Sequence, residues 1–400
     1  MRKSHSIEWI TTGGLCTGCG LCQGMFPEKV RTTLSPDGYL RPVATTPLDH
    51  QERLKLCDVC PGLHIKHENP GPNYHPHWGP LFEVRTGYAN DPATRLVGSS
   101  GGVLSGLLVH LLESSQVDFV AHIKAATDDP LGNELTISRT REQVLAGAGS
   151  RYAPSAPLFK LKELLAMPGR FAFVGKPCDV AALRRYEVLN PSISKKVPFM
   201  LSFMCAGIPS RKGTLAILDK FGVAPEQVKS FAYRGNGWPG KTTAITTDGQ
   251  RFETDYSTSW GTVLNRHLQF RCKICPDGIG EFADVVGADA WYGKDGYPDF
   301  AEREGRSLIL SRTAKGEALV HSAVAAGAIT VQPLAVDEIA KMQPYQLNRK
   351  RLVLSRVLAL KLMRRPAPQF VNFPLLRLAT QLSLRENISS FMGTLRRIIT

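Results

Sequence analysis

The sequence of 400 residues contains no run of eighteen uncharged apolar residues, which is about the length that a membrane-spanning helix needs. The first ten residues also lack the apolar stretch of a secretory signal, because charged side chains interrupt them at Arg2, Lys3 and Glu8. Internal repeats and low-complexity tracts are absent as well. We therefore expect a cytoplasmic, globular protein with enough apolar residues to form real cores.

Negative charge is nearly missing from the C-terminal segment. Residues 341–400 hold twelve of the 49 Lys and Arg residues but only one acidic residue, Glu386, which gives this segment +11 of the total formal charge of +14. Residues 347–365 and 375–399 interleave these charges with apolar residues, which predicts two basic amphipathic helices. Such helices favour an anionic membrane surface, or they pack on the body with their Arg side chains in water.

Nine cysteines, arranged largely in C-x-x-C units, favour metal binding over disulfides in a reducing compartment. The first group consists of Cys16, Cys19, Cys22, Cys57 and Cys60. The first three, two residues apart and separated by glycines, suit three corners of a 4Fe-4S cluster, and Cys60, followed by Pro61, suits the fourth. Cys57 is then spare, although the spacing alone does not decide whether Cys57 or Cys60 is the fourth ligand. The alternative is a zinc site that leaves Cys22 unused.

The middle of the chain alternates strand and helix patterns, which predicts an α/β core with βαβ units. The first unit comprises a strand at 82–89, a flexible turn at 98–102 that opens a helix, and a strand at 118–123. Two further buried strands, at 170–175 and 198–204, each lead into a helix.

The second cysteine group is drawn from distant positions. Cys178 and Cys205 each follow a predicted buried strand, and the carboxyl ends of parallel strands meet at one edge of a sheet. Cys272 and Cys275 complete a set of four thiols. Cys178 also stands at a helix N-terminus, whose dipole favours the thiolate. Structural zinc is again the alternative to an iron-sulfur cluster.

The turn before the first core helix offers a phosphate site. It consists of Gly98, Ser99, Ser100, Gly101 and Gly102. Free backbone N–H groups and the helix dipole favour a phosphate at such a position. The string lacks the G-x-G-x-x-G spacing, and by itself it is more often an ordinary tight turn.

Six short motifs follow one another along the chain. They are Cys16-Thr-Gly-Cys-Gly-Leu-Cys22, Gly98-Ser-Ser-Gly-Gly102, Ser150-Arg-Tyr152, Gly175-Lys-Pro-Cys178, Arg271-Cys-Lys-Ile-Cys-Pro-Asp277 and Ala283-Asp-Val-Val-Gly-Ala-Asp-Ala-Trp291. Over about residues 10–325 this combination resembles the beta subunits of coenzyme F-420 hydrogenases and dehydrogenases. Distant relatives of that family include iron-sulfur divinyl chlorophyllide reductase and hydroxymethyl chlorophyll a reductase. The first motif differs from that of the chlorophyll-reducing relatives, which disfavours a pigment substrate.

The resemblance implies FAD and 4Fe-4S clusters as cofactors. The second cysteine group would hold the cluster nearer the flavin, and the turn at 98–102 would contact the FAD diphosphate. Further cofactor-binding candidates are Ser150, Arg151, Tyr152, Lys176 and Pro177. Lys176 is close to Cys178 in the sequence, so we expect it between flavin and cluster, as a catalytic residue that tunes the flavin. The alternative for Arg151 and Lys176 is a solvated surface charge.

Four regions are therefore expected: a small ferredoxin-like 4Fe-4S module at 1–65, a linker at 66–81, an FAD- and 4Fe-4S-binding α/β core at 82–335, and a basic amphipathic helical tail at 336–400. The expected function is an oxidoreductase that passes electrons through two 4Fe-4S clusters and FAD to an organic acceptor, the deazaflavin coenzyme or another small molecule. The donor would be ferredoxin-like or another protein.

Two other functions fit the sequence. One is an electron-relay subunit that serves a partner enzyme, and the other is a zinc-stabilised interaction module. We expect no nucleic-acid partner, while an oligomer is compatible with the sequence. The basic tail adds the option of a peripheral position at the inner membrane surface.

Overall fold

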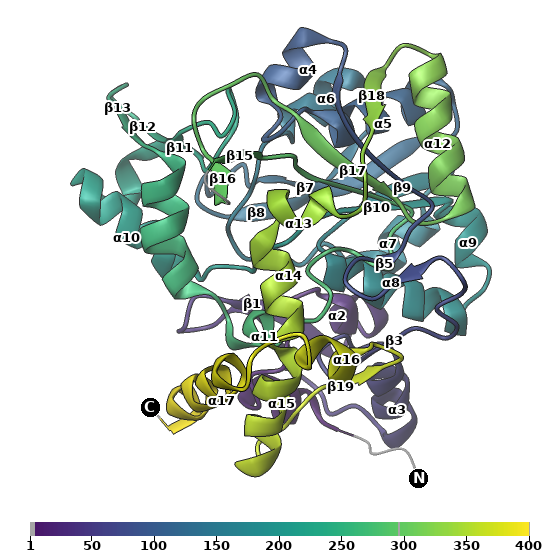
Figure 1. The fold of residues 1–400 in the computed structure, drawn as a ribbon, viewed down its shortest axis with the longest axis vertical. Coiled ribbons are helices and arrows are strands. Elements are labelled where there is room, and N and C mark those ends of the chain that lie inside the picture. The colour runs from purple at the N-terminus through teal and green to yellow at the C-terminus, as the bar shows by residue number, and fades with distance from the viewer. Residues whose placement is uncertain (1–4, 295–296, 400) are drawn as a thin grey trace.

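The computed structural model describes residues 5–294 and 297–399, and an eight-stranded mixed sheet forms its centre (Figure 1). The strand order is β18-β6-β17-β14-β10-β9-β7-β8. In chain order these strands are β6 (Glu83–Ala89), β7 (Phe119–Ala125), β8 (Asn133–Ser138), β9 (Phe171–Val174), β10 (Phe199–Phe203), β14 (Val285–Asp289), β17 (Ser307–Ser311) and β18 (Ile329–Pro333).

The four strands β7, β9, β10 and β14 pair in parallel, whereas β8, β17 and β18 run antiparallel to their neighbours. The predicted strands at 82–89, 118–123, 170–175 and 198–204 are confirmed within a few residues. The predicted βαβ unit is wider than the sequence indicates. β6 and β7 run in the same direction, but four apolar strands lie between them, because burial favours such strands at the centre of a sheet.

Helices cover both faces of the sheet, as the alternation of side chains along a strand requires. On one face Val120, Leu201 and Ile309 pack with helices α5 (Val103–Glu113) and α12 (Ala314–Ala325). On the other face Phe173 and Met200 pack with α8 (Pro177–Leu189). The core is thus a three-layer α/β arrangement.

Smaller elements surround this core. The helices are α4 (Pro92–Val97), α6 (Arg141–Ala146), α7 (Leu161–Ala166), α9 (Ile193–Lys196), α10 (Arg211–Phe221) and α11 (Phe270–Lys273). The strands are β4 (Tyr74–His75), β5 (Gly79–Pro80), β11 (Val228–Ala232), β12 (Thr242–Thr246), β13 (Arg251–Thr254), β15 (Tyr292–Lys294) and β16 (Tyr297–Asp299). A π-helix at Ser257–Val263 and 3-10 turns at Pro225–Gln227 and Leu264–His267 complete this part.

The N-terminal segment packs directly on the core. It comprises α1 (Ile7–Thr12), α2 (Leu21–Met25), β1 (Val30–Leu34), β2 (Leu40–Ala44), α3 (His50–Val59) and β3 (His64–Lys66). Leu21 and Val59 belong to the same apolar cluster as the sheet side chains Phe173 and Met200. The following segment, 66–81, buries Trp78 in that cluster too.

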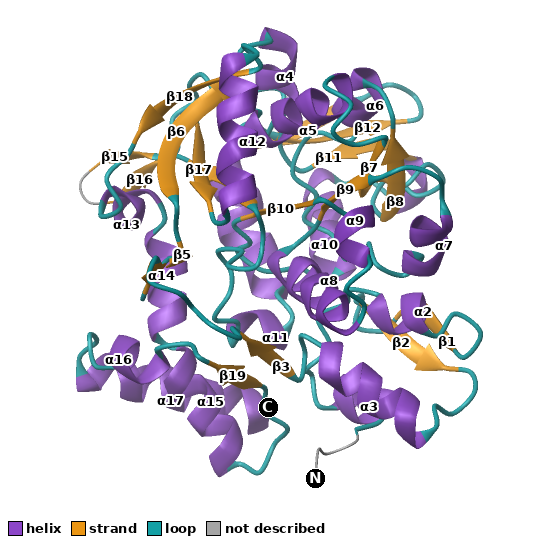
Figure 2. Cartoon of the chain, turned by 90° about the vertical axis from the view of Figure 1, so that its right-hand side faces the viewer, coloured by secondary structure: helices purple, strands orange, loops and turns teal. Residues whose placement is uncertain are grey.

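The C-terminal segment lies at the same end of the molecule as the N-terminal one (Figures 1 and 2). It comprises α13 (Glu338–Met342), α14 (Pro344–Arg351), α15 (Val353–Leu362), β19 (Gln369–Val371), α16 (Leu375–Ala379) and α17 (Leu384–Ile399). Strand β19 pairs in parallel with β3. The helix predicted at 347–365 is divided at Leu352, and the one at 375–399 is divided after α16. Among the described residues, no helix is long and apolar enough to cross a membrane.

Candidate functional site

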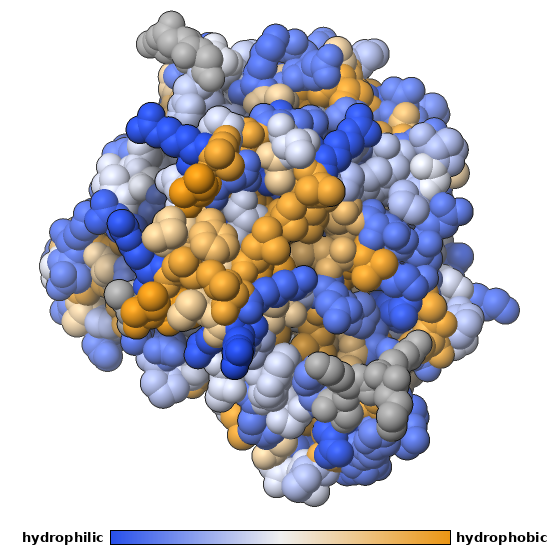
Figure 3. All heavy atoms as spheres, turned by 60° about the horizontal axis from the view of Figure 1, so that its bottom comes forward, coloured by the Kyte–Doolittle hydropathy of each residue, from blue (hydrophilic) through white to orange (hydrophobic). Residues whose placement is uncertain are grey.

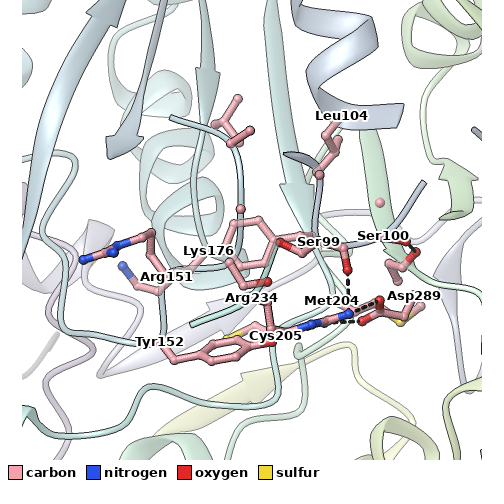
Figure 4. Close-up of a pocket in the computed structure, with 18 of the residues that line it drawn as sticks. Ser99, Ser100, Leu104, Arg151, Tyr152, Lys176, Met204, Cys205, Arg234 and Asp289 are labelled. Carbon is pink, nitrogen blue, oxygen red and sulfur yellow. Dashed lines mark hydrogen bonds and ion pairs between the residues drawn. The ribbon is translucent and has the colours of Figure 1, made fainter. Parts of the chain in front are cut away.

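A cavity of about 310 Å³ opens at the carboxyl ends of the parallel strands, where open α/β sheets assemble their sites (Figure 4). Eight of the ten predicted cofactor-binding residues line it: Gly98, Ser99, Ser100, Gly102, Ser150, Arg151, Tyr152 and Lys176. Gly101 and Pro177 lie outside the lining. The structure therefore brings together residues that are up to 78 positions apart in the sequence.

The turn at 98–102 is anchored by the sheet and opens α5 toward this cavity. Ser100 Oγ donates to the carbonyls of Ala288 at 3.1 Å and Arg306 at 2.9 Å. A Cβ on Gly101 would lie 2.6 Å from the Gly87 carbonyl oxygen, so this glycine serves close packing on β6. The first helical hydrogen bond joins Gly106 N to Gly102 O, which leaves the preceding N–H groups of α5 available to a ligand.

Arg151 is tied to the protein rather than to solvent. Its guanidinium donates to Asn133 Oδ1 at 2.8 Å, to the Phe231 carbonyl at 2.7 Å and to the Gly132 carbonyl at 2.8 Å. Burial lowers its pKa. Figure 4 shows the side chain directed away from Ser99 and Ser100. Arg151 therefore holds the wall of the cavity, and the solvated alternative is wrong.

Arg234 is a cavity residue that the sequence analysis missed. Its guanidinium forms a two-point ion pair with Asp289, at 3.0 and 2.9 Å, and donates to the Ser99 carbonyl at 2.5 Å (Figure 4). It also lies over the rings of Tyr256 and Trp291. Burial opposes its charge, but Asp289 more than offsets this and holds the pKa well above its ordinary value. Asp289 falls within a quoted motif, whereas nothing around Arg234 marks it.

Lys176 is buried, so the solvated alternative is wrong for this residue as well. Its Nζ lies 2.8 Å from Asp179 Oδ2 and donates to Ser155 Oγ at 2.8 Å. Burial lowers the pKa of Lys176, but the opposing effects, the largest of them from the Asp179 carboxylate, are together greater and the pKa is raised overall, so the ammonium stays charged. Asp179 Oδ1 is buried with no hydrogen-bond partner among the described residues. The pair thus presents an unsatisfied polar atom beside the cavity.

The first cysteine group encloses a small cavity of about 30 Å³ that is lined by Cys16, Cys19, Cys22 and Cys60. Cys57 is not in this lining, and its Sγ instead accepts a hydrogen bond from His5 N at 3.3 Å. Burial raises the pKa of Cys19 to about 12, so this thiol is neutral at physiological pH unless a metal takes the thiolate.

The second cysteine group gathers where β9 and β10 end. These strands pair in parallel, which brings Cys178 and Cys205 to one edge, and α11 supplies Cys272 with Cys275 just after it. The four thiols are near enough that the charge of one affects the pKa of others. Burial raises the pKa of Cys178 well above its usual range, so the expected gain from the helix dipole is outweighed. Cys205 also lines the large cavity.

Buried cations surround the second group. Arg271 donates from Nη2 to the Pro61 carbonyl at 2.7 Å, while its Nε and Nη1 are buried without partners among the described residues. Arg349, from the tail helix α14, donates to the Cys205 carbonyl at 2.7 Å. Burial raises the pKa of Cys275, and both cations oppose this larger effect. Unsatisfied donors beside buried thiols suit an anionic metal cluster.

Neither group has the compact arrangement of a site for one ion. Within 5–294 and 297–399, no three His, Cys, Asp or Glu side chains are placed to hold a single metal ion. The first group instead surrounds a space. Four thiols around one space are the donor set that a 4Fe-4S cluster takes.

Comparison with known proteins agrees with the motifs. Residues 84–163 match the family model for the N-terminal part of the coenzyme F420 hydrogenase/dehydrogenase beta subunit, and residues 169–337 match that for its C-terminal part. Coenzyme F420 hydrogenase subunit beta of Methanococcus voltae is 26% identical over 68% of this chain and 94% of that protein. A subunit of the F(420)H(2) dehydrogenase of Methanosarcina mazei is 21% identical over 78% and 83%.

A chlorophyll-reducing relative is also similar: the 7-hydroxymethyl chlorophyll a reductase of Oryza sativa is 23% identical over 60% of this chain and 50% of that protein. Among solved structures, one protein of the F420-reducing [NiFe] hydrogenase complex of Methanosarcina barkeri shares the fold. The TM-score is 0.53 at 21% identity, over 70% of this chain and 95% of that one. The two family models together span most of the α/β core. The chain therefore belongs to the family of coenzyme F420 hydrogenase/dehydrogenase beta subunits.

Proposed function

We propose that this chain is an iron-sulfur flavoprotein oxidoreductase that passes electrons through two 4Fe-4S clusters and FAD to an organic acceptor. The observation that carries the proposal is the position of Cys205, which belongs to a group of four thiols and also lines the cavity built by the turn at 98–102. A redox group held by this thiol would lie beside any ligand of the cavity.

The residues fit the two kinds of cofactor in different ways. The open N–H groups of α5 suit the FAD diphosphate, and the aromatic side chains of Tyr152, Tyr256 and Trp260 supply apolar walls. Bound FAD would supply hydride and single-electron chemistry. Cys16, Cys19, Cys22 and Cys60 would ligate one cluster, and Cys178, Cys205, Cys272 and Cys275 the other.

The Lys176–Asp179 pair supports an electron route between the two groups. Asp179 raises the pKa of Cys19 in the first group, after the larger effect of burial. A thiolate at either Cys178 or Cys19 would raise the pKa of Lys176. The pair also borders the large cavity. Its two charges therefore stand where the two cysteine groups and the cavity meet.

Deazaflavin coenzyme is the acceptor that the family name favours, with another small molecule as the option. A ferredoxin-like or other protein would deliver electrons to the first group. The second candidate function is an electron-relay subunit, because relatives are named as subunits of a hydrogenase and a dehydrogenase. A relay would reduce only a protein partner.

Anaerobic purification followed by quantitation of iron, sulfide and flavin tests the proposal. We expect about eight iron atoms and about eight sulfides for each FAD, since each cluster holds four of each. Assays with deazaflavin and with other small acceptors then separate the reductase from the relay. A protein that binds zinc and no flavin would contradict both.

A further inference from the structure

Helix α17 packs on the molecule with its polar side. Ser355 Oγ on α15 donates to Asn387 Oδ1 at 2.6 Å, and Arg356 Nε donates to Ser390 Oγ at 3.0 Å. Thr394, one turn further along the helix, is buried. Amphipathic helices of globular proteins normally place the apolar side inward, so this helix has the reverse orientation.

The apolar side of α17 consequently faces outward. Four large side chains at intervals of four, four and seven residues are exposed: Leu384 by 76%, Ile388 by 52%, Met392 by 47% and Ile399 by 72%. Neighbouring helices α15 and α16 add the exposed side chains Leu358, Leu362 and Leu376. Figure 3 shows apolar side chains gathered in a band across this end of the molecule. We call this band the tail apolar face.

Basic residues border the tail apolar face. Arg385, Arg396 and Arg397 are exposed on α17, and Lys361, Arg365 and Arg377 are exposed on or just after the neighbouring helices. The one acidic residue of 341–400, Glu386, accepts hydrogen bonds from Ser383. The surface therefore combines exposed apolar side chains with a positive border, the pattern of helices that lie in the headgroup region of anionic bilayers.

We propose that the tail apolar face docks this protein on an anionic lipid bilayer, with α17 lying in the plane of the surface. Charge complementarity selects anionic lipid as the occupant, since the border is positive and the apolar side chains need a non-polar phase. The tail also contacts the second cysteine group, because Arg349 and Arg356 donate to the carbonyls of Cys205 and Lys273. Docking would hold that group on the membrane side of the molecule.

Co-sedimentation with vesicles tests this proposal on the full chain, with or without bound cofactors. Equimolar phosphatidylglycerol and phosphatidylcholine vesicles serve as the anionic probe, and pure phosphatidylcholine vesicles as the neutral one. We expect binding to the anionic vesicles, weakened by salt, and little binding to the neutral ones. The Ile388→Glu and Met392→Glu variants should each lose at least tenfold in partition coefficient.

The matched control is Val188→Glu on α8, which changes an apolar side chain of similar exposure, 56%, outside the tail. Truncation after residue 345 is a poorer test, because it removes the buried residues Arg349 and Lys350 together with α17. Equal binding of Ile388→Glu and Val188→Glu, equal binding to both vesicle types, or self-association through this face without vesicle binding would overturn the proposal. None of these results depends on cluster or flavin content, so the proposed function would stand or fall separately.

Discussion

At the residue scale, the site is distinguished by buried charges that border buried thiols. Lys176, Arg271 and Arg349 are all buried. Each is near enough to a cysteine for the charge of one group to affect the pKa of the other. An isolated buried cation is costly, so these positions need anionic partners. Asp179 provides one for Lys176, and the proposed clusters would provide the others.

Removal of the Lys176 charge should lower the flavin midpoint potential, because the ammonium would stabilise an anionic reduced ring. For the two-electron couple, about 1.4 kcal/mol of lost stabilisation corresponds to about 30 mV, and we expect at least this shift for Lys176→Met. Lys176→Arg should retain most of the potential. Spectroscopic redox titration measures both, with exposed Lys195→Gln as the control. An unchanged potential in Lys176→Met would remove the tuning role.

The Arg349 cation should raise the midpoint potential of the second cluster, as the Lys176 cation should raise that of the flavin. Arg349→Gln removes a cation beside Cys205 and should lower the cluster potential, with about 59 mV for each tenfold change in the one-electron equilibrium. Potentiometry followed by electron paramagnetic resonance reads the cluster directly. The matched control is Arg365→Gln, which removes an exposed charge from the same tail. Equal potentials in the two variants would show that Arg349 has only a structural role.

His122 on β7 should make the free energy of unfolding depend on pH in the acidic range. Burial lowers its pKa to about 4, and its Nε2 lies 2.7 Å from Ser138 Oγ. The folded state therefore resists protonation, and stability is lost as the pH falls from about 6.5 toward 4. Between pH 7 and 5 this amounts to about 2 kcal/mol. Urea unfolding of the wild type should show this loss, and His122→Gln should lack it; parallel pH profiles would contradict the assignment.

At the element scale, the sequence predicted where the strands lie along the chain, but it did not predict their order in the sheet. Apolar runs mark β6, β7, β9 and β10, but nothing local in the sequence states that β17 and β14 insert between β6 and the others. The parallel pairing of β9 and β10 did follow from their pattern, and it united Cys178 with Cys205. Arg234 could not be foreseen, because its partner Asp289 is 55 residues away and its own neighbourhood carries no pattern.

The tail helix α14 is part of the core rather than an appendage. Lys350 Nζ lies 2.6 Å from Glu281 Oε1, and His67 Nε2 lies 2.9 Å from Oε2 of the same carboxylate. Lys350→Met leaves Glu281 buried beside a weaker partner and should reduce the free energy of unfolding by about 3–5 kcal/mol. Exposed Lys341→Met should change it by less than about 0.5 kcal/mol. Chemical denaturation checks both, and equal losses would contradict this role.

At the scale of the whole molecule, the second cysteine group lies next to both the cavity and the tail. The first group lies in the N-terminal segment, and Cys205 of the second group lines the cavity. The charge of Asp179 affects the pKa of a thiol in each group, Cys19 and Cys178. The local C-x-x-C spacing predicted the first group, whereas the second group was predicted from the strand ends that precede Cys178 and Cys205. The position of the tail beside the second group could not be predicted, because Arg349 reaches it only through the tertiary fold.

The most direct test of the two-cluster account is iron quantitation and electron paramagnetic resonance on paired serine variants. The structure places Cys60 at the first cavity and Cys57 against His5. Cys60→Ser should lose or strongly alter the signal of the first cluster, with up to about four iron atoms lost, while Cys57→Ser keeps both clusters. Equal iron content and equal spectra in the two variants would contradict the account.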